Sequence, residues 1–126
     1  MIFHKSKFHI DIYNVEVTII IMTSPKEVSK KALQLVKKYN FNSEIVKEAF
    51  GYTLFLGDKI PEAYIILDVN DLSVATITHE VYHLTDYIKD HVGITEEELA
   101  ANLNGFLNNK IFEIIELVKL EIKKHE

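Results

Sequence analysis

The sequence predicts a single α+β domain over residues 1–126, in which a small, mostly antiparallel sheet packs with an N-terminal helix, a middle helix and a long C-terminal helix. Three observations lead to this prediction. The 126 residues are 48% hydrophobic, which suits one domain with a substantial core. β-branched and aromatic residues gather in short alternating runs that are typical of strands. Elsewhere, apolar residues recur at helical spacing.

Composition excludes several classes of function. The net charge is −5 and all 14 basic residues are lysines, so the arginine fork that grips phosphates is missing and we expect no nucleic-acid partner. Cysteine is absent, which excludes disulfides and thiolate metal sites. Because no apolar run is long enough to cross a bilayer, we expect a cytoplasmic protein with no membrane partner.

The first strand region runs from Phe8 to Met22. Its apolar residues occupy even positions up to Ile12 and odd positions from Val15, so the alternation changes phase near Tyr13 and Asn14. Such a change indicates either a bulge in one long strand or a tight turn between two short ones.

A helix is predicted from Ser24 to about Asn40. The segment Ser24-Pro25-Lys26-Glu27 has the form of a capping box with proline at the first helical position. Apolar residues follow at helical spacing, namely Val28, Ala32, Leu35, Val36 and Tyr39. Residues 43–50 are expected to add a short helical turn that ends at Gly51, since glycine readily takes the left-handed conformation of helix ends.

Two further strands are predicted at Tyr52–Leu56 and Ala63–Val69. The turn-forming segment between them, which contains glycine and proline, indicates an antiparallel hairpin. The run Tyr64–Leu67 is apolar at both parities, which is typical of a central strand covered on both faces.

The two remaining helices are predicted from about Leu72 to His91 and from Thr95 almost to the end of the chain. The last helix has an apolar stripe formed by Leu103, Leu107, Ile111, Ile114, Val118 and Ile122. Roughly 28 helical residues would span about 42 Å, more than the width of a compact domain of this size. We therefore expect either a break near Asn108 and Asn109 or a protruding end that packs against another subunit, as in a homodimer.

The middle helix contains His79-Glu80-Val81-Tyr82-His83, the one place where spacing alone indicates chemistry. Imidazoles four residues apart share a helix face and can bind one metal ion, while the glutamate beside the first can hold a metal-bound water. On a helical wheel the two histidines lie opposite the predicted core stripe, which consists of Ile77, Val81, Leu84 and Ile88. The alternative interpretation is an ordinary polar helix face in contact with water.

A zinc site of this kind needs a third protein ligand. The extended pattern H-E-x-x-H-x-x-G-x-x-H is not met, because Asp86 stands in place of its glycine and no histidine follows three residues later. A carboxylate from the following helix is the remaining source. The nearest candidates are Glu96, Glu97 and Glu98.

In these segments the chain resembles the small zincins of the gluzincin type, particularly the compact H-E-x-x-H proteins carried by phages and prophages. Thr78–Asp86 matches their motif helix, which follows a β-hairpin. Glu97–Gly105 matches the segment acid-Glu-x-x-Ala-x-Leu-x-Gly that comes after it, although Asn102 replaces a residue that is usually aromatic. The resemblance covers Tyr52 to about Leu107.

The resemblance implies a minimal zincin-like fold and a metallopeptidase acting on a peptide or protein substrate. One zinc ion would be held by His79, His83 and Glu98, with Glu97 as the next choice for the third ligand. Glu80 would act as general base, taking the proton of the zinc-activated water and passing it to the leaving amine. Four tyrosines are candidates for stabilising the tetrahedral intermediate, namely Tyr52, Tyr64, Tyr82 and Tyr87.

Three alternatives stay open: the role of Glu98, the role of Asp86 and the function itself. Thr95–Glu98 is also a capping box, and a tight antiparallel pairing of the helices around Gly93 would place Glu98 opposite Ile88, about 7 Å from the level of His83. Asp86 either orients a ligand imidazole or faces solvent. At the level of function, the alternative to a peptidase is a catalytically inactive zincin-like protein that acts as a metal-containing binding module.

Overall fold

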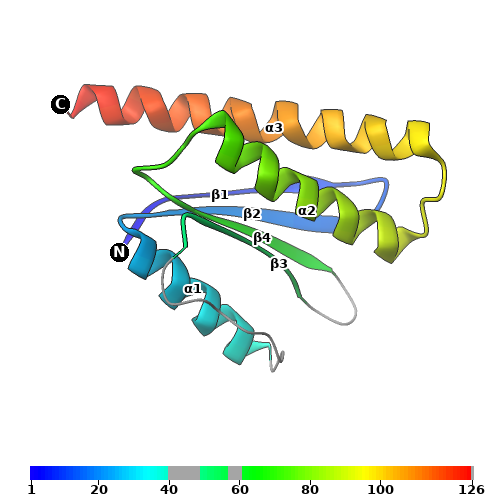
Figure 1. Cartoon of the computed structure of the whole chain (residues 1–126), viewed down its shortest axis with the longest axis horizontal. Coiled ribbons are helices and arrows are strands. Elements are labelled where there is room, and N and C mark those ends of the chain that lie inside the picture. The colour runs from blue at the N-terminus through cyan, green and yellow to red at the C-terminus, as the bar shows by residue number, and fades with distance from the viewer. Residues whose placement is uncertain (40–48, 57–60, 126) are drawn as a thin grey trace.

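The computed structural model describes residues 1–39, 49–56 and 61–125, within which four strands form one mixed sheet and three helices pack against it (Figure 1). The strands are β1 (Ile2–Ile10), β2 (Val15–Met22), β3 (Gly51–Leu56) and β4 (Glu62–Asp68). The helices are α1 (Pro25–Lys38), α2 (Val74–Val92) and α3 (Glu97–Lys124). The predicted α+β class is confirmed.

β1 and β2 form an antiparallel hairpin, so the change of phase near Tyr13 marks a tight turn and not a bulge in one strand. Asn14 closes the turn with a φ of 51°, a left-handed conformation that asparagine adopts more readily than most residues. β1 begins at Ile2, well before the predicted start at Phe8. As an edge strand it needs backbone pairing on one side only, and its first residues, Ile2–Lys7, are mostly exposed and lack an apolar alternation, so they give no strand signal.

The strand order is β1-β2-β4-β3, with antiparallel outer pairs and a parallel central pair of β2 and β4. The predicted hairpin of β3 and β4 is confirmed, as is the central position of the apolar run Tyr64–Leu67. The parallel central pair is the part of the sheet that was not predicted. Alternation along a strand reports which faces are buried and carries no information about the direction of the neighbouring strand.

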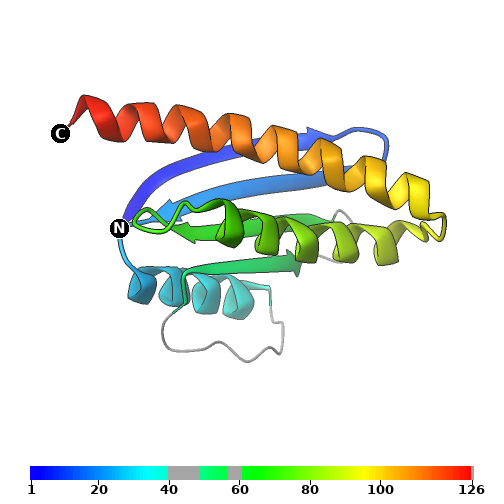
Figure 2. The same ribbon diagram turned by 45° about the horizontal axis from the view of Figure 1, so that its top comes forward.

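The sheet is covered on both faces, by α1 on one and by α2 and α3 on the other (Figure 2). Neighbouring residues of β2 therefore enter different cores: Ile20 packs with α1, whereas Ile19 and Ile21 pack with α2 and α3. Burying each such side chain contributes about 1.5–3 kcal/mol to the free energy of unfolding. None of the helices in the described part of the chain has the length and apolarity needed to cross a bilayer.

α1 begins as predicted at Ser24, whose hydroxyl accepts a hydrogen bond from the Glu27 backbone N–H at 3.2 Å. Only half of the capping box is formed, because the Glu27 carboxylate pairs with the terminal amine of Met1 at 3.0 Å. That ammonium group holds the pKa of the Glu27 carboxyl below its ordinary value.

Gly51 opens β3 and does not end a helix. Among the described glycines only Gly93 has a positive φ, so the predicted left-handed conformation of Gly51 is wrong. Most of the helical turn predicted for residues 43–50 lies outside the described residues, and Phe50 forms a bend. The requirement for glycine at this position comes from side-chain packing in the candidate site.

α3 runs unbroken for 28 residues, so the break expected near Asn108 and Asn109 does not occur. The Asn108 amide donates to the backbone oxygen and the side-chain oxygen of Asn104 at 3.0 and 3.1 Å, which keeps it within its own helix. Buried Leu107 and Ile111 continue the apolar stripe on either side. The alternative, a protruding end, is observed: the C-terminal turns of α3 extend past the sheet in both ribbon views (Figures 1 and 2).

One polar contact fixes how α3 lies along α2. The Asn104 amide donates to the Thr85 hydroxyl at 3.0 Å between the two helices. We expect Thr85→Val and Asn104→Leu each to lower the free energy of unfolding by about 0.5–1.5 kcal/mol, since each removes this hydrogen bond, although the Thr85 hydroxyl still donates to the Val81 backbone oxygen at 2.8 Å when Asn104 is replaced. In urea unfolding, the double variant should lose clearly less free energy of unfolding than the sum of the losses in the two single variants. Strictly additive losses would contradict this packing.

Candidate functional site

The helix α2 begins and ends at well-defined caps. Ser73 accepts a hydrogen bond from the Thr76 backbone N–H at 3.2 Å, and Gly93 ends the helix in a left-handed conformation with a φ of 76°. The predicted core stripe is confirmed, since all of its members are buried, namely Ile77, Val81, Leu84 and Ile88. The caps and this stripe fix the rotation of the helix and turn its histidine-bearing face toward β3.

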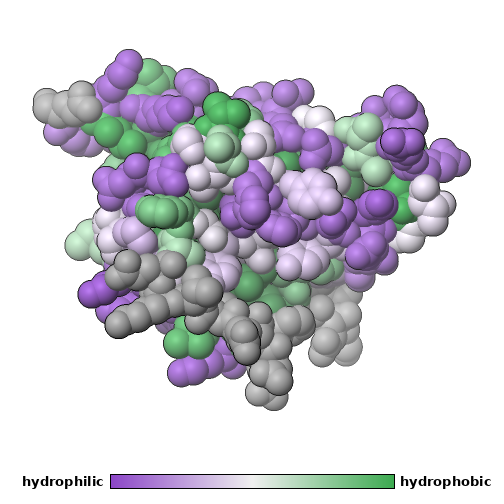
Figure 3. Space-filling model, viewed as in Figure 1, coloured by the Kyte–Doolittle hydropathy of each residue, from purple (hydrophilic) through white to green (hydrophobic). Residues whose placement is uncertain are grey.

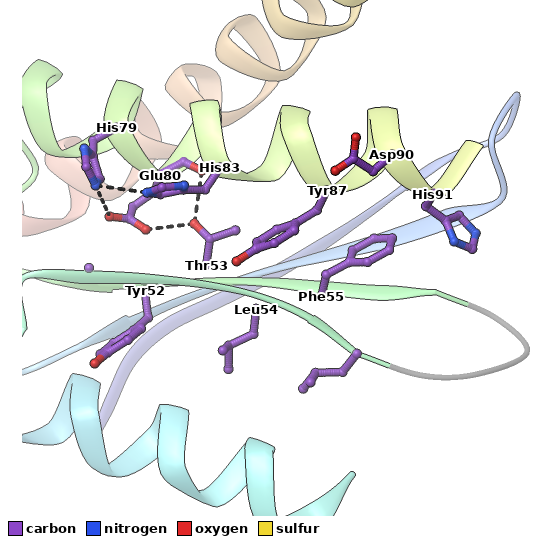
Figure 4. Close-up of a pocket in the computed structure, with 12 residues that line it drawn as sticks. Tyr52, Thr53, Leu54, Phe55, His79, Glu80, His83, Tyr87, Asp90 and His91 are labelled. Carbon is purple, nitrogen blue, oxygen red and sulfur yellow. Dashed lines mark hydrogen bonds and ion pairs between the residues drawn. The ribbon is translucent and has the colours of Figure 1, made fainter. Parts of the chain in front are cut away.

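His79 and His83 point toward each other across one turn of α2 (Figure 4). Their Nε2 atoms are 3.2 Å apart, and the two rings meet edge to face with centroids 4.7 Å apart. Two nitrogen ligands in a tetrahedral zinc site, each about 2.0–2.1 Å from the ion, would be separated by roughly 3.4 Å. The pair therefore has the spacing of two ligands that converge on one ion, and the same distance also suits an N–H···N hydrogen bond.

Glu80 is directed into the protein, although its neighbour His79 is 67% exposed at the side chain. Glu80 as a whole residue is only 6% exposed. The Thr53 hydroxyl lies 2.8 Å from Glu80 Oε1 and 3.0 Å from the Glu80 backbone oxygen, so it can donate to either. The other carboxylate oxygen, Oε2, lies 4.0 Å from His79 Nε2. The carboxylate is thus held between a hydroxyl of β3 and the imidazole pair.

Gly51 leaves the space that the Glu80 side chain occupies. A Cβ atom at Gly51 would lie 3.0 Å from Glu80 Cγ and 3.1 Å from Oε2, too close for an undisturbed contact. Gly51 and Thr53 were not identified from the sequence. Their partner lies 27 residues beyond Thr53, and neither residue belongs to a recognisable motif. The sequence prediction placed Thr53 in a strand and Gly51 at the end of a helical turn, so nothing in the sequence put the two residues on one face of the same strand.

A groove of about 740 Å³ runs between β3 and α2. The imidazole pair and Glu80 line one end of it. At the other end Phe55 stacks on Tyr87, with ring centroids 6.1 Å apart, and meets the edge of His91 at 5.4 Å. The groove therefore joins a candidate metal centre to an aromatic end along a single strand (Figure 4).

β3 lies at the edge of the sheet, and no further strand of the described chain pairs with its outer side. The bond from the Asp68 N–H to the Phe50 oxygen, 3.1 Å long, sets which residues face β4. In an antiparallel pair, residues whose N–H and C=O groups bond to the partner strand alternate with residues whose groups point away from it. Since Phe50 bonds to β4, the backbone groups of Gly51, Thr53 and Phe55 point toward the outer edge. The residues whose side chains face α2 are thus also those with outward backbone groups.

The structure does not bring Glu98 to the imidazole pair. Gly93 turns the chain straight back, so α3 lies antiparallel to α2 with Asn104 level with Thr85 (Figures 1 and 2). Counting back from that contact at 1.5 Å per residue places Glu98 level with His91, about 12 Å along the helix from His83. Glu97 in the same turn is no nearer. The helices pair antiparallel, as considered from the sequence, but Glu98 lies level with His91 and not with Ile88, and both glutamates are exposed in the first turn of α3.

The remaining predicted residues divide between the groove and other surfaces. Asp86 is half-buried, and no hydrogen bond joins it to an imidazole within the described residues. Tyr87 reaches from α2 toward Thr53 in the groove, and the Tyr82 ring lies against His83 with centroids 5.9 Å apart. The side chain of Tyr52 points toward α1. Tyr64 also lies on that face, where its hydroxyl is 3.1 Å from that of Tyr39, which removes it as a helper in the groove.

The donor set fits zinc in part. His79 and His83 supply two imidazole nitrogens at a suitable separation. In the part of the chain that the structure describes, no group of three or more histidine, aspartate and glutamate side chains is arranged to hold an ion. The predicted ligand set is therefore assembled only as far as its histidine pair.

Comparison of the chain with protein-family models, with curated proteins and with solved structures finds no match in any of the three. The likeness to small zincins thus depends on the segments Thr78–Asp86 and Glu97–Gly105 alone.

The hydroxyl of Thr53 is expected to be necessary for burying the Glu80 carboxylate. Thr53→Val keeps the shape of the side chain but leaves the carboxylate oxygen without its donor, so the free energy of unfolding should fall by about 1–3 kcal/mol in urea denaturation at neutral pH. The matched control is Thr53→Ser, which keeps the hydroxyl and should lose less. Equal stability of the two variants would show that the hydroxyl does not support Glu80.

Proposed function

We propose that the protein is a zinc-dependent metallopeptidase that hydrolyses a peptide bond in an extended segment lying along the outer edge of β3. The observation that carries the proposal is the convergence of the His79 and His83 Nε2 atoms at 3.2 Å beside the buried Glu80 carboxylate. Structural helix surfaces have no need of a buried carboxylate next to two converging imidazoles, whereas hydrolysis at a metal centre uses both.

The imidazoles of His79 and His83 would hold the ion. A bound zinc ion would polarise the scissile carbonyl and make the attacking water more acidic. Glu98 stays a prediction as the third ligand. In the described arrangement it lies level with His91, so its participation requires the connection around Gly93 to rearrange.

Glu80 is placed to act as the general base. Its Oε2 atom faces the imidazole pair, where it can take the proton of the attacking water and return it to the leaving amine. Thr53 holds the other oxygen, so the carboxylate keeps one orientation through both transfers. Because Gly51 has no side chain, the Glu80 carboxylate can pack directly against β3.

The exposed backbone of β3 favours an extended peptide as substrate. The outward N–H and C=O groups of Thr53 and Phe55 can pair with a peptide strand in the way that peptides add to sheet edges. A peptide residue opposite Thr53 would then lie beside Glu80 and His83. Strand pairing brings the scissile carbonyl to the imidazole pair without any further domain.

A second candidate function is that of a non-catalytic, zincin-like binding protein. It is favoured by a different observation: among the described residues, no third side chain joins the imidazole pair in a group that could hold a metal ion. Under this proposal the protruding end of α3 would contact a partner or a second copy of the chain. Leu117 and Leu120 are 65% and 57% exposed on that end.

The two candidates are separated by zinc content and by Glu80. For the peptidase, the purified protein should contain about one zinc per chain by elemental analysis, and His79→Ala should lose it. His91→Ala is the matched control on the same helix and should keep it. Glu80→Gln should retain zinc and the Thr53 contact but cleave a peptide library at least about 100-fold more slowly.

Protein that takes up no zinc, even when zinc is supplied, would contradict the peptidase. Zinc-containing protein whose Glu80→Gln variant behaves like the unaltered chain in every assay would instead support the binding protein.

A further inference from the structure

The aromatic end of the groove is a recess distinct from the metal end. Tyr87 and Phe55 present stacked rings, and His91 closes the recess from the side (Figure 4). Asp90 lines the same groove from the last turns of α2. A groove lined both by aromatic rings and by a carboxylate is suited to a cationic side chain, since the ring faces and the carboxylate are both electron-rich.

Asp90 has no partner for its charge. Among the described residues it takes part in no ion pair and no side-chain hydrogen bond, and it is exposed to solvent. Within the described residues 86–98, where α2 ends and α3 begins, acidic residues outnumber the single lysine, Lys89. They are Asp86, Asp90, Glu96, Glu97 and Glu98. Hydrophilic side chains dominate this end in the space-filling view (Figure 3).

The register of β3 determines which residue of a bound peptide reaches this recess. Residues that lie directly opposite each other in an antiparallel pair project their side chains from the same face of the sheet. A peptide residue opposite Phe55 therefore projects on the α2 side of the strand, where Tyr87 stacks on Phe55 and Asp90 lines the groove, and the residue opposite Thr53 projects on the side that carries Glu80. The two positions are two residues apart, about 7 Å along the strand.

We infer that this recess, formed by Phe55, Tyr87, Asp90 and His91, is a subsite that selects a lysine or arginine side chain two residues from the scissile bond. The inference rests on the proposed peptidase function for its cleavage consequence. Its binding consequence is independent of catalysis. An uncharged aliphatic side chain would also contact the rings, but it would leave Asp90 unpaired, and an acidic side chain would be repelled.

The test measures peptide binding to the Glu80→Gln variant, so that no cleavage occurs. Fluorescently labelled extended peptides carry lysine, norleucine or glutamate at one position, which is moved along an otherwise alanine-rich sequence. Norleucine has the stem of lysine without its charge. At one position of the series, the lysine peptide should bind about tenfold more tightly than the norleucine peptide by fluorescence anisotropy, and the glutamate peptide should bind weakest.

Charge reversal identifies the residue responsible. Asp90→Asn should reduce the preference for lysine over norleucine to about twofold or less, and Asp90→Lys should favour the glutamate peptide. Tyr87→Leu should weaken lysine binding while the preference over glutamate remains. The matched control is Glu113→Gln, an exposed acid of α3 that does not line the groove, and it should leave all preferences unchanged.

Equal binding of lysine and norleucine peptides, or a preference that persists in Asp90→Asn, would overturn the inference. Cleavage by the unaltered protein separates this failure from failure of the proposed function. Glu80-dependent cleavage without any preference for basic residues would reject the subsite alone. Lysine-selective, Asp90-dependent binding without cleavage would reject the peptidase alone.

Discussion

The buried Glu80 carboxylate is the constraint on which the arrangement of the groove depends. Moving a carboxylate out of water costs several kcal/mol unless hydrogen bonds compensate for it, and here the compensation comes from Thr53 in the edge strand. The same contact, with Gly51 packed beneath the side chain, holds α2 at a fixed height above β3. That height places the imidazole pair directly over the strand edge. Because burying this carboxylate lowers the stability of the fold, its position is better explained by a role in catalysis than by a role in folding.

The turn at Gly93 has the opposite consequence for the metal centre. Its left-handed conformation sends α3 straight back along α2, and the contact between Asn104 and Thr85 fixes the level at which the two helices meet. Most of the predicted apolar stripe of α3 is buried, with Ile115 fully buried where Ile114 was predicted and with Ile114 and Ile122 only partly buried, so the fold gains stability from this packing. The cost falls on the predicted ligand set, because the acidic first turn of α3 is held far from His83. The connection at Gly93 can therefore either pair α3 with α2 as described or bring the first turn of α3 to the imidazole pair, but it cannot do both.

Features with local causes could be predicted from the sequence, and those with distant causes could not. The cap at Ser24, the hairpin of β3 and β4 and the buried stripe of α2 each follow from residues within a few positions of one another. The histidine pair belongs to this group, since one helical turn sets its geometry. The parallel pairing of β2 with β4 depends on the path of the whole chain. The roles of Thr53 and Gly51 could not be predicted for the same reason, because these residues contact Glu80 only after β3 has packed against α2.

Both ends of the groove are formed by β3 and α2, so an insertion in either element would disturb the alignment of the two ends. β3 and α2 run side by side, and long helical side chains lean toward the N-terminus, which brings Tyr87 back toward Thr53 (Figure 4). One residue inserted between Thr53 and Phe55 would reverse the parity of the strand and turn one of them away from α2. One residue inserted between Glu80 and Tyr87 would rotate the helix face by about 100°. The metal end and the aromatic end are therefore tied to each other by register, and neither can shift alone.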